Sequence, residues 1–424
     1  MSFPENTPLP PPLPPTDEPL GRWPADIAAP IPSARRQLAW GKRMFRRYER
    51  PPSKARTATL HIGLFVLTLC TTILAGVALT RGGVDFIDFS VFGLPAPERA
   101  EQLGRGLTYA LTFLGVLTVH EFGHYFTARY NHVRASLPYY IPFPLGLGTF
   151  GAVIRIQEPI FSRREFFDIG LAGPLAGLVV AVGVLAYGFT HLPDPLAYVQ
   201  HIHPEFIPLG ADYARAYEGQ MGLTLSRPLL YVLLEHWLAE PARLPHPNEL
   251  MHYPLLVAGG LSLFFTALNL IPIGQLDGGH ILYGLLGPRR AGRLSGVLFV
   301  AFIFYAGVGL FSLRSDWQTW AYGGVPYAVY LWLVFRKALP RPRQVVGLAA
   351  LVWVAQLLVA TLWPAVDGQP GWLLFGLMLG RLSGIYHPSA PDERALSPGR
   401  QVLGWVMVVL FVLCFSPAPF VGLR

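Results

Sequence analysis

Two histidines one helical turn apart stand in an apolar part of the chain, in the segment VHEFGH at 119–124. On a helix, residues i and i+4 project from the same face. His120 and His124 are therefore predicted to bind one metal ion. Glu121 beside them is predicted to act as general base toward a water molecule that the metal activates. Ionisable side chains in a membrane helix are costly and are functional by default. The segment thus predicts metal-assisted hydrolysis.

A zinc ion needs a third protein ligand and an open position for water. The stretch 269–280 reads NLIPIGQLDGGH and offers Asp277. Pro272, with Gly274, breaks the helix at membrane depth, which is tolerated only where protein or a cavity satisfies the freed backbone groups. We expect Asp277 at the cytosolic end of this span, at the depth of the two histidines. The alternative interpretation of Asp277 is a plain helix-end cap.

The elements that position these residues must lie in a membrane. The chain has 424 residues, of which 52% are apolar and 14% charged, and its mean hydropathy is +0.40. A soluble domain carries about 25% charged residues. This composition excludes a disordered protein, a secreted disulfide scaffold and an ordinary cytosolic enzyme. Two cysteines, Cys70 and Cys414, are too few for a cysteine zinc site or a disulfide framework.

The apolar runs predict an all-α polytopic membrane protein with about eight or nine transmembrane helices. A span needs about 20 apolar residues. The candidate spans are 58–79, 107–128, 166–190, 254–276, 294–313, 317–335, 344–363, 371–385 and 401–417. The eighth is short and contains Arg381, so a re-entrant segment is the alternative to a span there, while 278–287 is expected to complete a broken helix after the fourth. Residues 1–56 are expected to form a disordered, proline-rich tail with a basic cytosolic juxtamembrane segment.

The charges predict an orientation. With the N-terminus in the cytosol and all nine spans threaded, 25 of the 33 lysines and arginines fall on the cytosolic side, as the positive-inside rule requires. The formal net charge of +8 is accounted for by basic residues on the cytosolic side of the membrane, and we expect no nucleic-acid partner. The loop 191–252 is then external. It contains a possible amphipathic helix near 228–239 and the histidines His201, His203, His246 and His252, interpreted as a solvated loop with adventitious metal binding as the alternative.

Between the second and third spans lies a stretch, 137–156, that is too apolar for a solvated loop and too rich in proline and glycine for a helix. The run from Ala152 to Ile156 is predicted to be a strand. An apolar strand near the metal would let an unwound peptide add alongside it. The alternative is a structural plug packed against the second span. The small residues Gly173, Pro174 and Gly177 are expected to let helices approach closely.

The two motifs HExxH and NxxPxxxxDG, each in its own helix, resemble the site-2 protease family of intramembrane zinc metalloproteases, in its compact form without a PDZ domain. The resemblance implies a three-helix catalytic core with a re-entrant β-like segment over 57–290, which includes the loop 191–252, and additional helices over 291–424. It implies one Zn2+ per chain, held by His120, His124 and Asp277, and Glu121 as the base. It also implies substrate contacts at three positions: Asn269, Gly148 and Gly151.

The function implied is cleavage of peptide bonds within transmembrane segments of other membrane proteins, in regulated intramembrane proteolysis. The expected location is a bacterial cytoplasmic membrane, with the oligomeric state left open. The alternative is a membrane transporter or metal-binding protein on the same scaffold. An intact Glu121 separates the two, because a binding site needs its ligands but no adjacent base.

Overall fold

The computed structural model describes residues 54–83, 89–217, 222–418 and 420–423. The predicted disordered tail, apart from its last residues, lies outside this part of the chain. Contacts divide the chain into the units Met1–Thr57 and Ala58–Arg424, and the features below belong to the second unit except for the first turn of α2.

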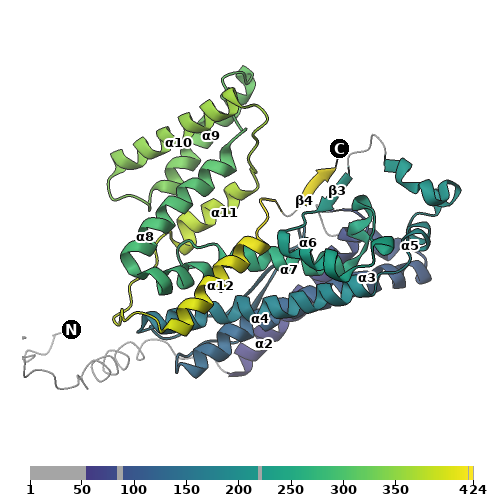
Figure 1. Cartoon of the computed structure of the whole chain (residues 1–424), viewed down its shortest axis with the longest axis horizontal. Coiled ribbons are helices and arrows are strands. Elements are labelled where there is room, and N and C mark those ends of the chain that lie inside the picture. The colour runs from purple at the N-terminus through teal and green to yellow at the C-terminus, as the bar shows by residue number, and fades with distance from the viewer. Residues whose placement is uncertain (1–53, 84–88, 218–221, 419, 424) are drawn as a thin grey trace, which may run out of the picture. The chain divides into compact units, whose positions relative to one another are not determined.

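The described chain is mostly helical (Figure 1). The α-helices are α2 (Lys54–Leu79), α3 (Ala96–Tyr130), α4 (Arg163–Thr190), α5 (Pro195–Ile202), α6 (Leu229–Leu238), α7 (Pro254–Leu270), α8 (Asp277–Gly307), α9 (Trp317–Phe335), α10 (Pro342–Leu362), α11 (Trp372–Met378) and α12 (Pro398–Cys414). Short 3-10 segments are η1 (Phe89–Gly93), η2 (Pro204–Tyr217), η3 (Pro241–Arg243) and η4 (Pro247–His252), and a π turn, η5 (Leu379–Ser383), follows α11. The helix predicted near 228–239 is confirmed as α6.

Two small antiparallel sheets accompany the helices. Strands β1 (Tyr139–Pro142) and β2 (Thr149–Val153) form a hairpin, with Tyr140 paired to Ala152. The predicted strand at 152–156 therefore begins and ends three residues earlier. Strand β3 (Gly222–Leu225) pairs with β4 (Phe420–Leu423), which joins the segment 191–252 to the far end of the chain.

Helices α3 and α4 lie side by side (Figure 1) and pack with α7 and α8 into the centre of the unit. Their apolar residues bury a continuous core that includes Tyr109, Phe113, Leu185 and Leu256. The hairpin lies against α2, where His61 Nδ1 donates to the carbonyl of Pro138 at 2.9 Å. These contacts fix the hairpin beside α3.

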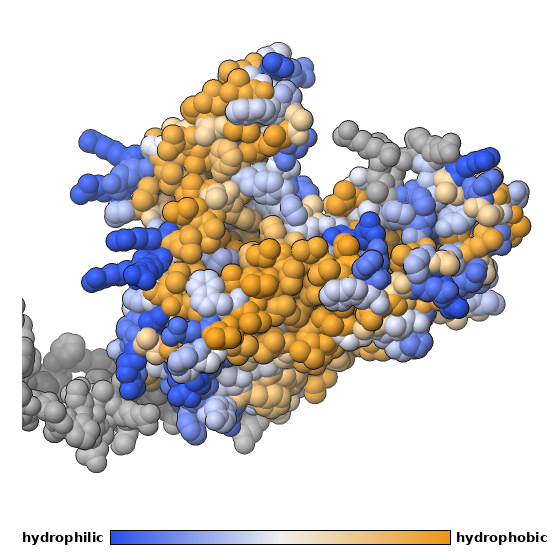
Figure 2. All heavy atoms as spheres, in the orientation of Figure 1, coloured by the Kyte–Doolittle hydropathy of each residue, from blue (hydrophilic) through white to orange (hydrophobic). Residues whose placement is uncertain are grey.

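In the described part of the chain, four helices are long and apolar enough to cross a membrane: Ala55–Leu79, Arg163–Thr190, Asp277–Gly307 and Pro342–Leu362. The other predicted spans are also helical, but the count of eight or nine is not confirmed. Large apolar side chains are exposed along α10 and α12, where Figure 2 shows broad hydrophobic surface, and they include Val346, Leu351, Leu358, Val402, Val409 and Val412. Such surface is typical of a protein in contact with lipid or with another protein.

The predictions around the fourth and fifth spans were partly wrong. Helix α7 ends at Leu270, six residues before the predicted end, because Pro272 and the positive φ of Gly274 (60°) divert the chain. The helical stretch α8 then covers Asp277 to Gly307, but the backbone of Gly287 (φ 75°, ψ 173°) is not helical and divides it by a kink. The predicted end of the segment 278–287 coincides with this kink, while the next helical part begins before the predicted position 294. Asp277 is consequently the first residue of α8 and does not end the preceding span.

Candidate metal centre

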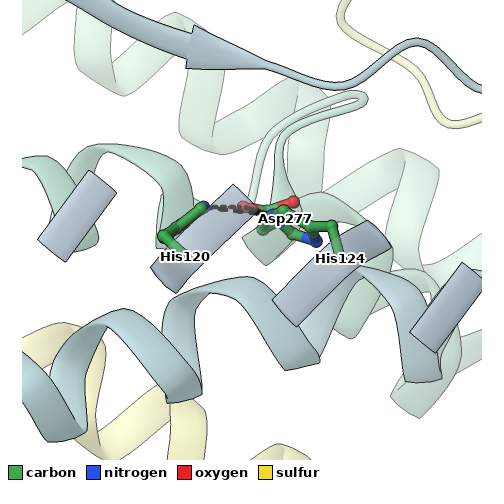
Figure 3. A group of neighbouring side chains, drawn as sticks. All are labelled: His120, His124 and Asp277. Atoms are coloured by element: carbon green, nitrogen blue, oxygen red, sulfur yellow. Dashed lines mark hydrogen bonds and ion pairs between the residues drawn. The ribbon is translucent and has the colours of Figure 1, made fainter. Parts of the chain in front are cut away.

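Three predicted ligands meet at one point (Figure 3). His120 and His124 project from one face of α3, and Asp277 reaches them from the start of α8. The Nε2 atoms of the two histidines are 3.0 Å apart. The Oδ2 atom of Asp277 lies 3.4 Å from Nε2 of His120 and 3.2 Å from Nε2 of His124. Both histidines are buried.

These separations fit a zinc ion. Ligands about 2.0–2.1 Å from a tetrahedral zinc lie about 3.3 Å from one another, and all three measured separations fall close to that value. His124 donates its Nδ1 proton to the carbonyl of Ile169 at 2.7 Å. This bond leaves the lone pair of His124 on Nε2, the nitrogen that faces Asp277. Two imidazoles and one carboxylate also form a donor set suited to zinc.

Glu121 is buried beside the ligands and held by the hairpin. Its Oε2 accepts a hydrogen bond from the backbone N–H of Ile154, the residue after β2, at 3.0 Å. The contact fixes the carboxylate next to the metal centre and engages only one of its two oxygen atoms. A carboxylate in this place can take a proton from a water molecule at the centre.

Helix α4 places three glycines, Gly170, Gly173 and Gly177, against the side chains of the centre; we call them the glycine floor. A Cβ at Gly173 would collide with Nε2 of His124, and one at Gly177 would lie 3.1 Å from Cβ of His120. A Cβ at Gly170 would lie 2.5 Å from Cβ of His280. The prediction that small residues let helices approach is therefore confirmed, and the approach is made at the metal ligands.

The loop before α8 is held by hydrogen bonds to the C-terminal half. The backbone N–H of Gly274 donates to Oγ of Ser295 at 2.9 Å, and Ser295 Oγ donates to the carbonyl of Ile385 at 2.8 Å. A Cβ at position 274 would collide with the carbonyl of Gly384. The position of Asp277 thus depends on residues of the chain's last hundred or so positions as well as on α8.

The centre opens into a cleft of about 960 Å³. Apolar side chains dominate its walls, and β2 lines it while β1 does not. Asn269 lies in the cleft, with its Nδ2 3.4 Å from Nε2 of His120, and Gly151 lies along β2. Gly148 lies elsewhere: it packs against the backbone of α2, and its carbonyl accepts from Thr71 Oγ1 at 2.7 Å. The structure therefore brings Gly151 and Asn269 to the centre but turns Gly148 away from it.

Sequence reasoning missed the N–H of Ile154, which is a backbone group that no residue type announces. His280 also lines the cleft, and its Nδ1 lies 2.7 Å from Nε2 of His387. The glycine floor did carry a signal, since Gly170, Gly173 and Gly177 are spaced by three and four residues and form one helix face.

Comparison with known proteins agrees with this geometry. Residues 108–313, which contain His120, Glu121, His124 and Asp277, match the family described as Peptidase family M50. The chain is also similar to curated plant proteins: the probable zinc metalloprotease EGY1, chloroplastic, of Arabidopsis thaliana is 30% identical over 235 residues, which cover 53% of this chain and 39% of that protein.

A second relative is the probable zinc metalloprotease EGY2, chloroplastic, of Oryza sativa subsp. indica, 27% identical over 243 residues, which cover 56% of this chain and 39% of the relative. The chain thus spans about two fifths of the length of the curated relatives it matches. No solved structure matches the chain significantly. The family match and the geometry together support zinc at this centre.

Proposed function

We propose that the chain is an intramembrane zinc metalloprotease of the site-2 type. The observation that carries the proposal is the convergence of His120, His124 and Asp277 around one point, with Glu121 fixed beside them, in an apolar cleft between membrane helices. A site for binding alone would not need a carboxylate held next to the ligands. In this proposal the two histidines and Asp277 hold the zinc and Glu121 is the base.

The chain's own residues would perform the proton transfers. When bound, zinc polarises the scissile carbonyl and acidifies a water molecule. Glu121 takes the proton of that water and passes it to the leaving amine. The Ile154 N–H keeps the carboxylate aimed at the cleft, and the Asn269 amide is placed to donate to the substrate backbone near the bond that breaks.

We propose that the substrate is a transmembrane segment of another membrane protein, cut during regulated intramembrane proteolysis. A helical segment hides its amides, so it must be unwound before cleavage. Strand β2 lines the cleft, and among the described residues it pairs with β1 on one edge only. An extended peptide that pairs with the other edge would lie across the centre. The hairpin would thus be the re-entrant element, with Gly151 at the substrate.

The membrane arrangement is part of the same proposal. It places the N-terminus in the cytosol of a bacterial cytoplasmic membrane, on the basis of the charge distribution. The named relatives are chloroplastic and lend the bacterial membrane no support. The proposed division is a tail over 1–56, a catalytic core over 57–290 and further helices over 291–424.

Two variants test the roles of base and ligand separately. Glu121→Gln is expected to keep one zinc at this centre while cleavage of a transmembrane substrate falls by about 10²–10⁴-fold, because only the proton acceptor is removed. Asp277→Ala is expected to lose most of this zinc together with activity. Zinc is measured by elemental analysis of purified protein, and cleavage by a reconstituted assay.

Either of two results would contradict the proposal. Wild-type zinc content in Asp277→Ala would remove this carboxylate from the ligand set. Unchanged proteolysis in Glu121→Gln would remove the base. A transporter or metal-binding protein on this scaffold would instead show no cleavage that depends on Glu121.

A further inference from the structure

A second group of metal-ligating side chains lies in the external segment, far from the centre described above in sequence. His203 precedes η2, and Glu249 and His252 belong to η4. One ligand atom from each of the three residues lies within 4.8 Å of the other two. We propose that His203, Glu249 and His252 bind a divalent transition-metal ion of the zinc class, in addition to the catalytic zinc.

The hydrogen bonds of the two histidines aim their lone pairs at each other. His252 donates its Nδ1 proton to the carbonyl of Thr80 at 2.7 Å. His203 donates its Nδ1 proton to the carboxylate of Glu205 at 2.9 Å. Both Nε2 atoms are then acceptors, yet they lie 3.2 Å apart. Two facing lone pairs at this distance repel unless a cation binds between them.

Glu249 completes the site with an unpartnered carboxylate. The side chain is 0% exposed, and neither of its oxygens has a hydrogen-bond partner among the residues that the structure describes. Its Oε2 lies 3.7 Å from Nε2 of His252. A buried acid without hydrogen bonds is costly. Coordination to a cation would satisfy this carboxylate.

A divalent ion fits the charges around the two histidines. Its two charges would be balanced by Glu249 as ligand and by Glu205 behind His203, the arrangement in which a carboxylate orients a ligating histidine.

The separations also suit the ion. Nitrogen ligands of a tetrahedral zinc lie about 3.3 Å apart, close to the 3.2 Å between the two Nε2 atoms. The oxygen of Glu249 at 3.7 Å needs only a small side-chain movement to join them. Two imidazoles and one carboxylate are the donor set of the catalytic centre as well. The same ion is therefore the natural occupant.

The position of the site gives it a structural role. Through Thr80 it touches the residue directly after α2, and through His252 it adjoins the start of α7. His203 brings in η2 from the middle of the external segment. A metal bound here would tie 191–252 to two membrane helices.

Metal counting in the purified full-length protein tests the proposal. We expect two zinc ions per chain in the wild type and one fewer in His203→Ala. His201→Ala is the matched control, because His201 lies in the same segment but pairs with Glu101 at 2.8 Å. It should keep the wild-type count. Asp277→Ala should lose the catalytic zinc and retain the external one, which separates failure of this proposal from failure of the proposed function.

A melting experiment provides an independent readout. A strong zinc chelator should lower the melting temperature of Asp277→Ala, which keeps the external ion, but should leave that of the double variant Asp277→Ala, His203→Ala unchanged. His203 is partly exposed, so its replacement is tolerated better than that of buried His252. An equal zinc count in the wild type and His203→Ala, or equal chelator shifts in the single and double variants, would overturn the proposal.

Discussion

Gly173 provides the space into which the imidazole of His124 fits, since any Cβ at this position would collide with Nε2, the nitrogen proposed to bind zinc. We expect Gly173→Ala to weaken zinc binding and cleavage by about 10–100-fold, the size of effect seen when the support of a metal ligand is disturbed. Zinc titration and the cleavage assay measure both.

Gly183→Ala is the matched control on the same helix. Nothing lies within 4 Å of a Cβ at this position, so the added methyl group meets open space. A helical alanine should stabilise α4 by roughly 0.5–1 kcal/mol relative to glycine and leave zinc binding intact. If both variants bind zinc like the wild type, the glycine floor does not control the centre.

The residues that converge at the centre were predictable where a side chain carries the chemistry. His120 and His124 follow from the helical period, and Asp277 follows from the polar residue after a helix break. Gly148 is the contrast: its glycine serves the turn (φ 81°) and the approach to α2, both of which depend on contacts distant in sequence. A valine there would clash with α2, so the position does not test substrate binding.

At the scale of elements, the hairpin offers the sharpest test of how substrate lies. In a cysteine-free Glu121→Gln background, a cysteine replacing Val153, which lines the cleft, should cross-link to a trapped substrate. If the substrate adds as a strand, the reactive substrate positions alternate, because side chains of a strand project to opposite faces. Mass spectrometry of the cross-linked pairs gives the pattern.

Ile141→Cys is the control, since it lies on β1 of the same hairpin and does not line the cleft. It should give few cross-links. Reactivity at every third or fourth substrate position, or equal yields from both cysteines, would mean that the substrate stays helical or binds elsewhere.

The boundaries of elements were less predictable than their existence. Helices α9 and α10 fall within two residues of the expected ranges, because their apolar runs end abruptly at charged or proline-rich segments. Gly287 and Pro288 show the limit. The non-helical backbone of Gly287 kinks α8 at the predicted end of 278–287, yet the helical backbone resumes directly after the kink, before the predicted start at 294. Local sequence propensity indicates roughly where a helix ends, and tertiary contacts determine the exact residue.

At the scale of the whole molecule, orientation across the membrane is testable by labelling. In cysteine-free protein, Arg341→Cys before α10 should be shielded from an impermeant thiol reagent in intact cells, and Glu240→Cys in the external segment should react. The reason is the concentration of basic residues on one side. Labelling is read by gel shift.

Cells opened with detergent provide the control, because both cysteines should then react. Selective labelling of the Arg341 position in sealed cells would reverse the proposed orientation, and with it the side on which the catalytic centre lies.

The loop that leads into Asp277 is held in place by residues that are synthesised much later. Gly274 lies directly against Gly384, and Ser295 links it to Ile385. A ribosome delivers the chain in order, and its N-terminal parts fold first. The last contacts around Asp277 therefore form only after Ile385 has emerged. On the proposed function, the nascent chain would have an incomplete catalytic centre until most of it has been synthesised.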